Sequence, residues 1–418
     1  MRATLGKIRK SRFARDAAVL QVAAGVTSVG NLASTMALAF LLGAQLQGTF
    51  YLAVALYSLF YLLANVGLST VTVSHVARAI GADDRDGVIA WLGFMLRASL
   101  ILSVAMLVIA ELTLPTVAHR LYDDPQVGHW AAFLCLIPLV EIPRMVCTAA
   151  FQGSRRMKDL AQLENATEAT RVFLVVSMIL ITGEAVGAVY GTLLASLTSS
   201  VLALILYRRA RRDEDADDER KSLLPPLGQV VRGWRRMPLK KGLVEGVQVG
   251  FLRNIDALVL DVLPMLLMGY FGGAAAAAYF RIAQRFLRMP LMLLQGISRT
   301  AMPAFSELVG VRDLSVLRKA FYRATLAGGF MITTGLLVAL PLIPFVTRNF
   351  FPHDYWEEVP RFCYLLVAGF VVTGFSGALE SFYVSTDRVR VALRIGVGLA
   401  PPPRSSQRIT RGVSDTTG

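Results

Sequence analysis

The chain has 418 residues, of which 55% are hydrophobic and 17% are charged. A soluble chain of this length would carry about 25% charged residues, so the composition excludes an ordinary soluble domain and indicates a polytopic membrane protein. The formal net charge of +14 would suggest nucleic-acid binding in a soluble protein. In a membrane protein, however, Lys and Arg collect in the cytoplasmic loops, and we therefore expect no nucleic-acid partner.

The sequence carries no motif for enzymatic or metal chemistry. Its three cysteines, Cys135, Cys147 and Cys363, lie in apolar surroundings at spacings that fit neither a zinc site nor a disulfide framework. It has no GxxxxGKS/T nucleotide-binding loop, and no paired carboxylates or nucleophile–base set at a membrane face. We expect a protein that is not an enzyme and uses no metal or cofactor.

Long apolar segments predict ten full membrane spans, because a helix needs about 20 mostly apolar residues to cross a bilayer. The spans cover residues 17–42, 49–69, 88–114, 130–151, 163–181, 185–207, the two arms of 240–299, 324–346 and 362–384. Lys and Arg concentrate in the N-terminal tail and in alternate loops, which places the N-terminus in the cytoplasm. The expected fold class is all-α, a multi-pass helix bundle in the cytoplasmic membrane.

A change in composition divides the chain into two halves. Residues 208–240 have mixed charge, adjacent prolines and little apolar continuity, which is typical of a cytoplasmic linker. We assign residues 1–207 to an N-terminal lobe with six spans, and residues 241–418 to a C-terminal lobe. The second lobe holds spans 7–10, a partial eleventh span at 391–400 and a polar tail, so we expect it to be incomplete.

Polar side chains share one helical face in two spans of the first half. In span 1 they are Gln21, Ser28, Asn31 and Thr35. In span 5 they are Glu164, Glu168 and Arg171. The span 1 set either lines a cavity or makes ordinary hydrogen bonds between helices, and the spacing leaves both open. The span 5 set lies near the predicted membrane entrance, where long side chains reach the headgroups at low cost.

Span 4 contains an acid beside a predicted break. Glu141 and Arg144 lie three residues apart, between Pro138 and Pro143. Two prolines this close kink or unwind a membrane helix and free its backbone carbonyls. Glu141 is therefore a candidate ion or proton site; the alternative is a local ion pair with Arg144.

The hairpin at 240–299 carries charges far from the ends of its two arms. They are Arg253, Asp256 and Asp261 in the first arm, and Arg281, Arg285 and Arg288 in the second. A charge facing lipid at mid-membrane costs at least about 3 kcal/mol, so these side chains face other helices or a wet cavity. The three arginines of the second arm share one face, and Asp261 and Arg281 are equally far from the turn.

Two interpretations of these charges remain open. Asp–Arg pairs within the hairpin would neutralise one another, as buried charges usually do. Alternatively, the four arginines exceed the two aspartates, and the excess binds an anion. Guanidinium groups bind phosphate oxygens in a bidentate geometry.

The two halves echo one another. Each half contains a hairpin with a helix ending at glycine, a very short turn, an aromatic pair and a long second helix. The first hairpin includes LGAQLQGTFYLA, and the second includes MGYFGGAAAAAYFRIAQRF. Both first helices start on the same side, which predicts a parallel repeat about an axis normal to the membrane. Substrate sites in transporters built this way lie between the lobes.

Several blocks give the chain a family resemblance over about residues 15–390. They are LGAQLQGTFYLA, FQGSRRMKDLAQLENATEATRVFLVVSMILITGEAVGAVYGTLLAS, NIDALVLDVL and AAYFRIAQRFLRMPLMLLQGISRTAMPAFSEL. In this order they resemble the polysaccharide flippases of the MOP superfamily, the Wzx-like polysaccharide biosynthesis proteins. The resemblance implies two six-helix lobes in a V shape. It also implies transfer of undecaprenyl- or dolichyl-(pyro)phosphate-linked sugars from the inner to the outer leaflet.

This resemblance and the charges together predict a substrate site. We expect Arg253, Arg281, Arg285 and Arg288, together with Asn31, to bind the lipid-linked sugar through its (pyro)phosphate. Without a nucleotide motif the energy would come from a cation or proton gradient, with Glu141, Asp256 and Asp261 as coupling residues. The expected partners are membrane lipids, glycan polymerase and glycosyltransferases, and the expected state is a monomer.

Three other functions stay open. A multidrug or cation antiporter of the same superfamily would need an acidic or aromatic cavity, which the arginine excess disfavours. A flippase for the peptidoglycan-precursor lipid would share the architecture but usually carries extra spans. A non-transporting membrane scaffold or remnant would explain an incomplete second lobe.

Overall fold

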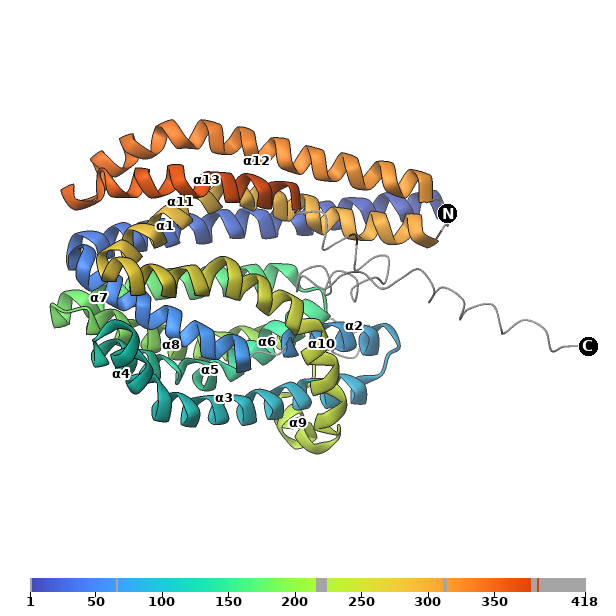
Figure 1. Ribbon diagram of the computed structural model, residues 1–418. Coiled ribbons are helices and arrows are strands. Elements are labelled where there is room, and N and C mark those ends of the chain that lie inside the picture. Colours follow the sequence, from blue (N-terminus) through green and yellow to red (C-terminus); the bar gives the residue numbers. More distant parts are fainter. Residues whose placement is uncertain (1, 65–66, 216–223, 311–313, 377–381, 383–418) are drawn as a thin grey trace, which may run out of the picture. The chain divides into compact units, whose positions relative to one another are not determined.

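The computed structural model describes residues 2–64, 67–215, 224–310, 314–376 and 382, and all regular structure in these ranges is helical (Figure 1). The elements are α1 (Arg2–Ala64), α2 (Leu68–Gly81), α3 (Arg85–Tyr122), α4 (Pro125–Leu134), α5 (Ile137–Val140), α6 (Ile142–Gly153), α7 (Met157–Thr182), α8 (Val186–Asp215), α9 (Leu227–Arg232), η1 (Gly233–Arg235), α10 (Leu239–Ala257), η2 (Leu258–Val262), α11 (Leu263–Gly310), α12 (Leu314–Phe350), η3 (His353–Tyr355) and α13 (Glu358–Ser376). The predicted all-α class is confirmed.

The described helices overlap the ten predicted spans, whose number stays a prediction. Seven are long and apolar enough to cross a membrane, or eight if a bent pair counts as one span. Two of these, 28–62 and 258–288, each contain a glycine with non-helical backbone angles and so comprise two arms. Large apolar side chains are exposed along the outer faces, for example Leu112, Phe173 and Ile181, as expected for surfaces in contact with lipid. The partial eleventh span and the polar tail lie outside the described residues.

The two glycine breaks have nearly the same backbone angles. Gly43 has φ 69° and ψ 176°, and Gly273 has φ 76° and ψ −178°, a combination open almost only to glycine. The chain reverses at each break, as Figure 1 shows for α1. Twelve residues separate Asn31 from Gly43 and Asp261 from Gly273, so these two side chains occupy equivalent positions in the predicted repeat.

The break in span 4 follows from its prolines. The helical pair Pro125–Val140 and Ile142–Gly153 is bent by 47°, and Pro138 and Pro143 sit at the starts of α5 and α6, where a proline needs no amide donor. At the bend, Arg144 donates to the Glu141 carboxylate at 2.5 Å. The predicted kink is confirmed, and Glu141 makes the local ion pair.

A π-helical turn, η2, interrupts the first arm of the second hairpin. The wider turn disturbs the regular carbonyl ladder, as such turns often do at functional sites. The Gln284 side-chain amide donates to the Leu260 carbonyl at 3.1 Å. This contact fixes the register of the hairpin and places Asp261 of η2 beside the arginine-bearing face of α11.

The chain comprises two compact units. One contains Met1–Met292 and Leu336–Ala368, and the other contains Leu293–Gly335 and Gly369–Gly418. In the first unit, a core cluster around the glycine breaks includes Phe50, Trp130 and Phe280. In the second unit, the rings of Phe330 and Phe375 meet edge to face with their centroids 6.1 Å apart. The division into lobes at residues 208–240 stays a prediction.

We call the end of the first unit that holds the breaks at Gly43 and Gly273 the turn end. The breaks approach each other there, because a Cβ atom on Gly48 would lie 1.7 Å from the Ala274 carbonyl oxygen. Tyr355, between α12 and α13, is fully buried at this end and hydrogen-bonds to Gln47. The turn end is therefore closed by tightly packed residues from both hairpins.

Candidate functional site

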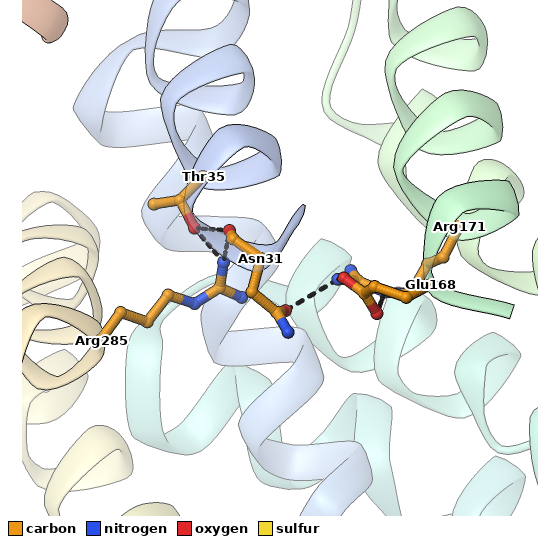
Figure 2. A network of polar contacts seen from close by, with 5 residues as sticks. All are labelled: Asn31, Thr35, Glu168, Arg171 and Arg285. Carbon is orange, nitrogen blue, oxygen red and sulfur yellow. Dashed lines mark hydrogen bonds and ion pairs between the residues drawn. The ribbon is translucent and has the colours of Figure 1, made fainter. Parts of the chain in front are cut away.

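Five residues from three helices of the first unit form a polar cluster inside the helix bundle. Figure 2 shows Asn31 and Thr35 of α1 between Arg285 of α11 and the Glu168–Arg171 pair of α7. We call these five residues the central polar cluster. Asn31, Arg171 and Arg285 each lie twelve residues from a turn glycine, namely Gly43, Gly183 and Gly273. Twelve residues span about 18 Å, near the middle of a hydrocarbon core about 30 Å thick.

Arg285 makes its contacts with neutral groups of α1. Its guanidinium donates to the Asn31 carbonyl at 2.6 Å and to the Thr35 hydroxyl. The group also lies over the Tyr51 ring, 5.8 Å from the centroid. A carbonyl, a hydroxyl and a ring face orient the cation but do not neutralise it. Within the described part of the chain, no carboxylate is hydrogen-bonded to Arg285.

Arg171 approaches Asn31 from the other side. It donates to the Asn31 side-chain oxygen at 2.8 Å and is ion-paired with Glu168 at 2.5 Å. Both carbonyl oxygens of Asn31 therefore face guanidinium groups from two different helices. Gly30 makes room for this arrangement, because a Cβ atom there would already lie 3.3 Å from Glu168 Cγ.

The cluster carries an excess of positive charge. Arg281 lies one helical turn from Arg285, and the charges of Arg171 and Arg281 both act on Arg285. Among the described side chains, the charged groups that act on Arg285 are thus two further guanidinium groups and one carboxylate, that of Glu168. Glu164 lies one turn farther from the turn end and is exposed. Holding unbalanced cations at mid-membrane is costly, and an anion bound among them would offset that cost.

Arg288 is ion-paired with Asp261 rather than directed into the cluster. The Asp261 side chain is 29% exposed and that of Arg288 is 41% exposed. Side chains lean toward the N-terminus of their own helix, so Asp261 leans away from the turn and Arg288 leans toward it. Asp261 and Arg285 each lie twelve residues from the break at Gly273, so Arg281 lies one turn nearer to the break than Asp261. The lean then makes Arg288, about one turn beyond Arg285, the ion-pair partner of Asp261.

The other predicted site residues have different surroundings. The side chains of Arg253 and Asp256 on α10 lie outside the described residues. Glu141 is held by Arg144 at the bend of span 4. The structure therefore brings together Asn31, Arg281 and Arg285, and pairs Arg288 with Asp261.

Arg171 and Glu168 belong to the cluster although their predicted place at the membrane entrance gave them little weight. Span 5 was predicted to begin at residue 163, whereas α7 begins at Met157, six residues earlier. Arg171 therefore lies about four turns into the helix. Counting back from Gly183 would have given this depth.

The arrangement of the helices defines the class of protein. A MOP-superfamily multidrug resistance MATE family transporter in an inward-facing conformation has a TM-score of 0.64 at 16% identity, covering 89% of this chain and 83% of that chain. A MATE in the bent conformation gives 0.63 at 18% identity, covering 93% and 84%. These likenesses show the fold of MOP-superfamily transporters.

The family follows from the sequence. The model of the polysaccharide biosynthesis protein family matches residues 13–309, and the chain belongs to this family. No curated protein matches the chain. Family and fold together make the protein a multi-pass membrane transporter and point to transport rather than catalysis.

One further solved structure bears on the polarity of the site. A MOP-superfamily transporter from Pyrococcus furiosus, described as having a binding pocket of reverse polarity that suggests a different function, has a TM-score of 0.68 at 18% identity. The similarity covers 92% of this chain and 84% of that one. The same fold is thus described with a pocket of different polarity.

Proposed function

We propose that the protein moves a polyprenyl-(pyro)phosphate-linked oligosaccharide across the cytoplasmic membrane by alternating access. The observation that carries this proposal is the excess of guanidinium groups in and beside the central polar cluster. Among the described side chains, Arg171, Arg281 and Arg285 act together with one carboxylate, that of Glu168, and the hydrogen-bond partners of Arg285 are neutral oxygens. A phosphate group supplies the missing negative charge, and the family match supplies the link to polysaccharide biosynthesis.

The chemistry of Arg285 favours exchange of its partners for a phosphate. A guanidinium group has five N–H donors, and its bonds to charged oxygens are about twice as strong as those to neutral ones. A phosphate that enters the cluster would displace the Asn31 carbonyl and the Thr35 hydroxyl from Arg285. Arg281 would be a second ligand, because its hydrogen bond to Gln284 is long, at 3.4 Å.

The distribution of basic residues gives the direction. Lys and Arg crowd the N-terminal tail and the linker region, so this side is cytoplasmic and the turn end is extracytoplasmic. The sugar would occupy a wet cavity while the phosphate is held at the cluster. Asp256, Asp261 and Glu141 remain the candidates for coupling to a proton or cation gradient. The protein would act as a monomer alongside glycosyltransferases and a glycan polymerase.

The test measures transfer of a fluorescent polyprenyl-pyrophosphate-linked sugar across the membrane of proteoliposomes. Replacing Arg285 with Ala should slow transfer about ten- to a hundredfold, as expected for the loss of a charge-assisted hydrogen bond. Arg285→Lys should recover only part of the rate, because an ammonium group lacks the planar fork. Arg361→Ala is the matched control, since that arginine is 74% exposed. Normal transfer by Arg285→Ala at equal protein level would refute the proposal.

The similar solved structures also fit a second function, export of organic cations. MATE transporters have this fold, but three arginines around one carboxylate would repel a cationic drug. Dye export by cells that carry the protein would favour this alternative. Rescue of wall synthesis in cells that lack the peptidoglycan-precursor flippase would instead identify a different lipid-linked substrate for the same cationic site.

A further inference from the structure

A second polar network lies between the central polar cluster and the turn end. Gln47, which follows the Gly43 break, is fully buried. Its amide nitrogen donates to the Thr35 carbonyl at 3.1 Å and to the Tyr51 hydroxyl at 3.2 Å. Because a carbonyl can only accept, the nitrogen must face Thr35. The amide oxygen then faces Tyr355, whose hydroxyl donates to it at 2.8 Å.

This network shares two residues with the contacts of Arg285. Arg285 donates to the Thr35 hydroxyl and lies over the Tyr51 ring. Gln47 holds the same two residues through the Thr35 carbonyl and the Tyr51 hydroxyl. One chain of contacts therefore runs from the arginine of the cluster to Tyr355 at the turn end.

Tyr355 lies where it can close the turn end. Its ring is fully buried against the rings of Tyr279 and Phe351, at centroid distances of 5.4 and 5.9 Å. Beside it, Gly48 packs directly on the backbone of Ala274. Breaking one hydrogen bond in such a buried network leaves a polar group unsatisfied, so the closed arrangement depends on Gln47 keeping all its partners.

We propose that Gln47 and Tyr355 form a gate that closes the turn end while Arg285 is bound to Thr35, and that an anion bound by Arg285 releases this gate. The inference rests on the proposed function, because it requires an anion to replace Thr35 at Arg285. Once Arg285 leaves the Thr35 hydroxyl and the Tyr51 ring, Thr35 keeps its own hydrogen bond to the Asn31 carbonyl, but the Tyr51 ring loses its contact with the guanidinium group. The Tyr51 hydroxyl, which accepts from the Gln47 amide, is then less firmly oriented. Gln47 is then held less firmly, which weakens its hydrogen bond to Tyr355 across the closed turn end.

The test uses Cys363, which is fully buried on α13 with its thiol facing the Ala283 carbonyl. In a protein with Cys135→Ala and Cys147→Ala, alkylation of Cys363 by a membrane-impermeant maleimide reports opening of the turn end. Tyr355→Phe keeps the ring and removes only the hydroxyl. It should speed alkylation about two- to tenfold, the change that loss of one hydrogen bond makes in an equilibrium.

Tyr279→Phe is the matched control, because it alters a neighbouring tyrosine whose ring packs edge-on against Tyr355; it should leave the rate unchanged. Inorganic pyrophosphate should speed alkylation of the protein with wild-type Tyr355 and should have no effect when Arg285→Ala is added. Equal rates for Tyr355→Phe and Tyr279→Phe would overturn the gate. A faster Tyr355→Phe with no response to pyrophosphate would overturn its link to Arg285. Neither alkylation measurement requires transport, so failure of the proposed function would be seen separately, in the proteoliposome transfer assay.

Discussion

The contact between Gly48 and Ala274 gives the sharpest prediction about how the turn end closes. A Cβ atom on Gly48 would lie 1.7 Å from the Ala274 carbonyl oxygen and 2.3 Å from its carbon. Ordinary contacts of this kind need about 3.5 Å, and the obstacle is backbone, which cannot rotate away. In Gly48→Ala the two hairpins must therefore separate by more than an ångström.

The free-energy cost of Gly48→Ala in the closed state follows from this geometry. Inserting one methyl group into a packed site costs about 1–3 kcal/mol, and each 1.4 kcal/mol changes an equilibrium tenfold. We expect Gly48→Ala to shift the closed-to-open ratio of the turn end by roughly 5- to 150-fold toward open. Alkylation of Cys363 should rise, and transport that needs complete closure should fall by a similar factor.

Gly25→Ala provides the comparison for this prediction. Gly25 lies on the same helix with nothing within 4 Å of its added Cβ atom. Alanine there should raise stability slightly, because glycine costs a helix up to about 1 kcal/mol relative to alanine. If Gly48→Ala and Gly25→Ala have equal melting temperatures, alkylation rates and transport rates, the two hairpins do not close on Gly48 and the reasoning fails.

Two other substitutions test the charges. Asn31→Asp would place a carboxylate 2.8 Å from Arg171 and near Arg285. Pyrophosphate binding, measured by calorimetry, should therefore weaken at least tenfold. Unchanged affinity would argue against an anion site. Asp261→Asn would leave Arg288 without its ion-pair partner and should lower the melting temperature. Because both side chains are partly exposed, the decrease should be smaller than for a fully buried pair. Adding Arg288→Gln to Asp261→Asn should restore most of the lost melting temperature.

The positions of most long helices could be predicted from the sequence. Apolar runs of sufficient length predicted the positions of the long helices, because in lipid the backbone can satisfy its hydrogen bonds only within a helix. Pro138 and Pro143 likewise predicted the bend in span 4, since proline acts on its own helix. These features depend on residues that are close together in the chain.

The partners of the arginines could not be predicted in this way. The predicted position of the turn placed Asp261 level with Arg281, whereas the break at Gly273 puts Asp261 level with Arg285, and the lean of the side chains then joins it to Arg288. The predicted start of span 5 was six residues later than the start of α7, so Arg171 was predicted to lie closer to the membrane surface than it does.

The sequence by itself determined the all-helical membrane class, the family and the set of charges that must be shielded from lipid. Only the tertiary structure decided that Asn31 lies between Arg171 and Arg285, residues 140 and 254 positions away. It also decided that the hydrogen-bond partners of Arg285 among the described residues are neutral. Hydropathy and helical spacing are properties of one segment, whereas neutralisation of a charge depends on which distant helix packs against it.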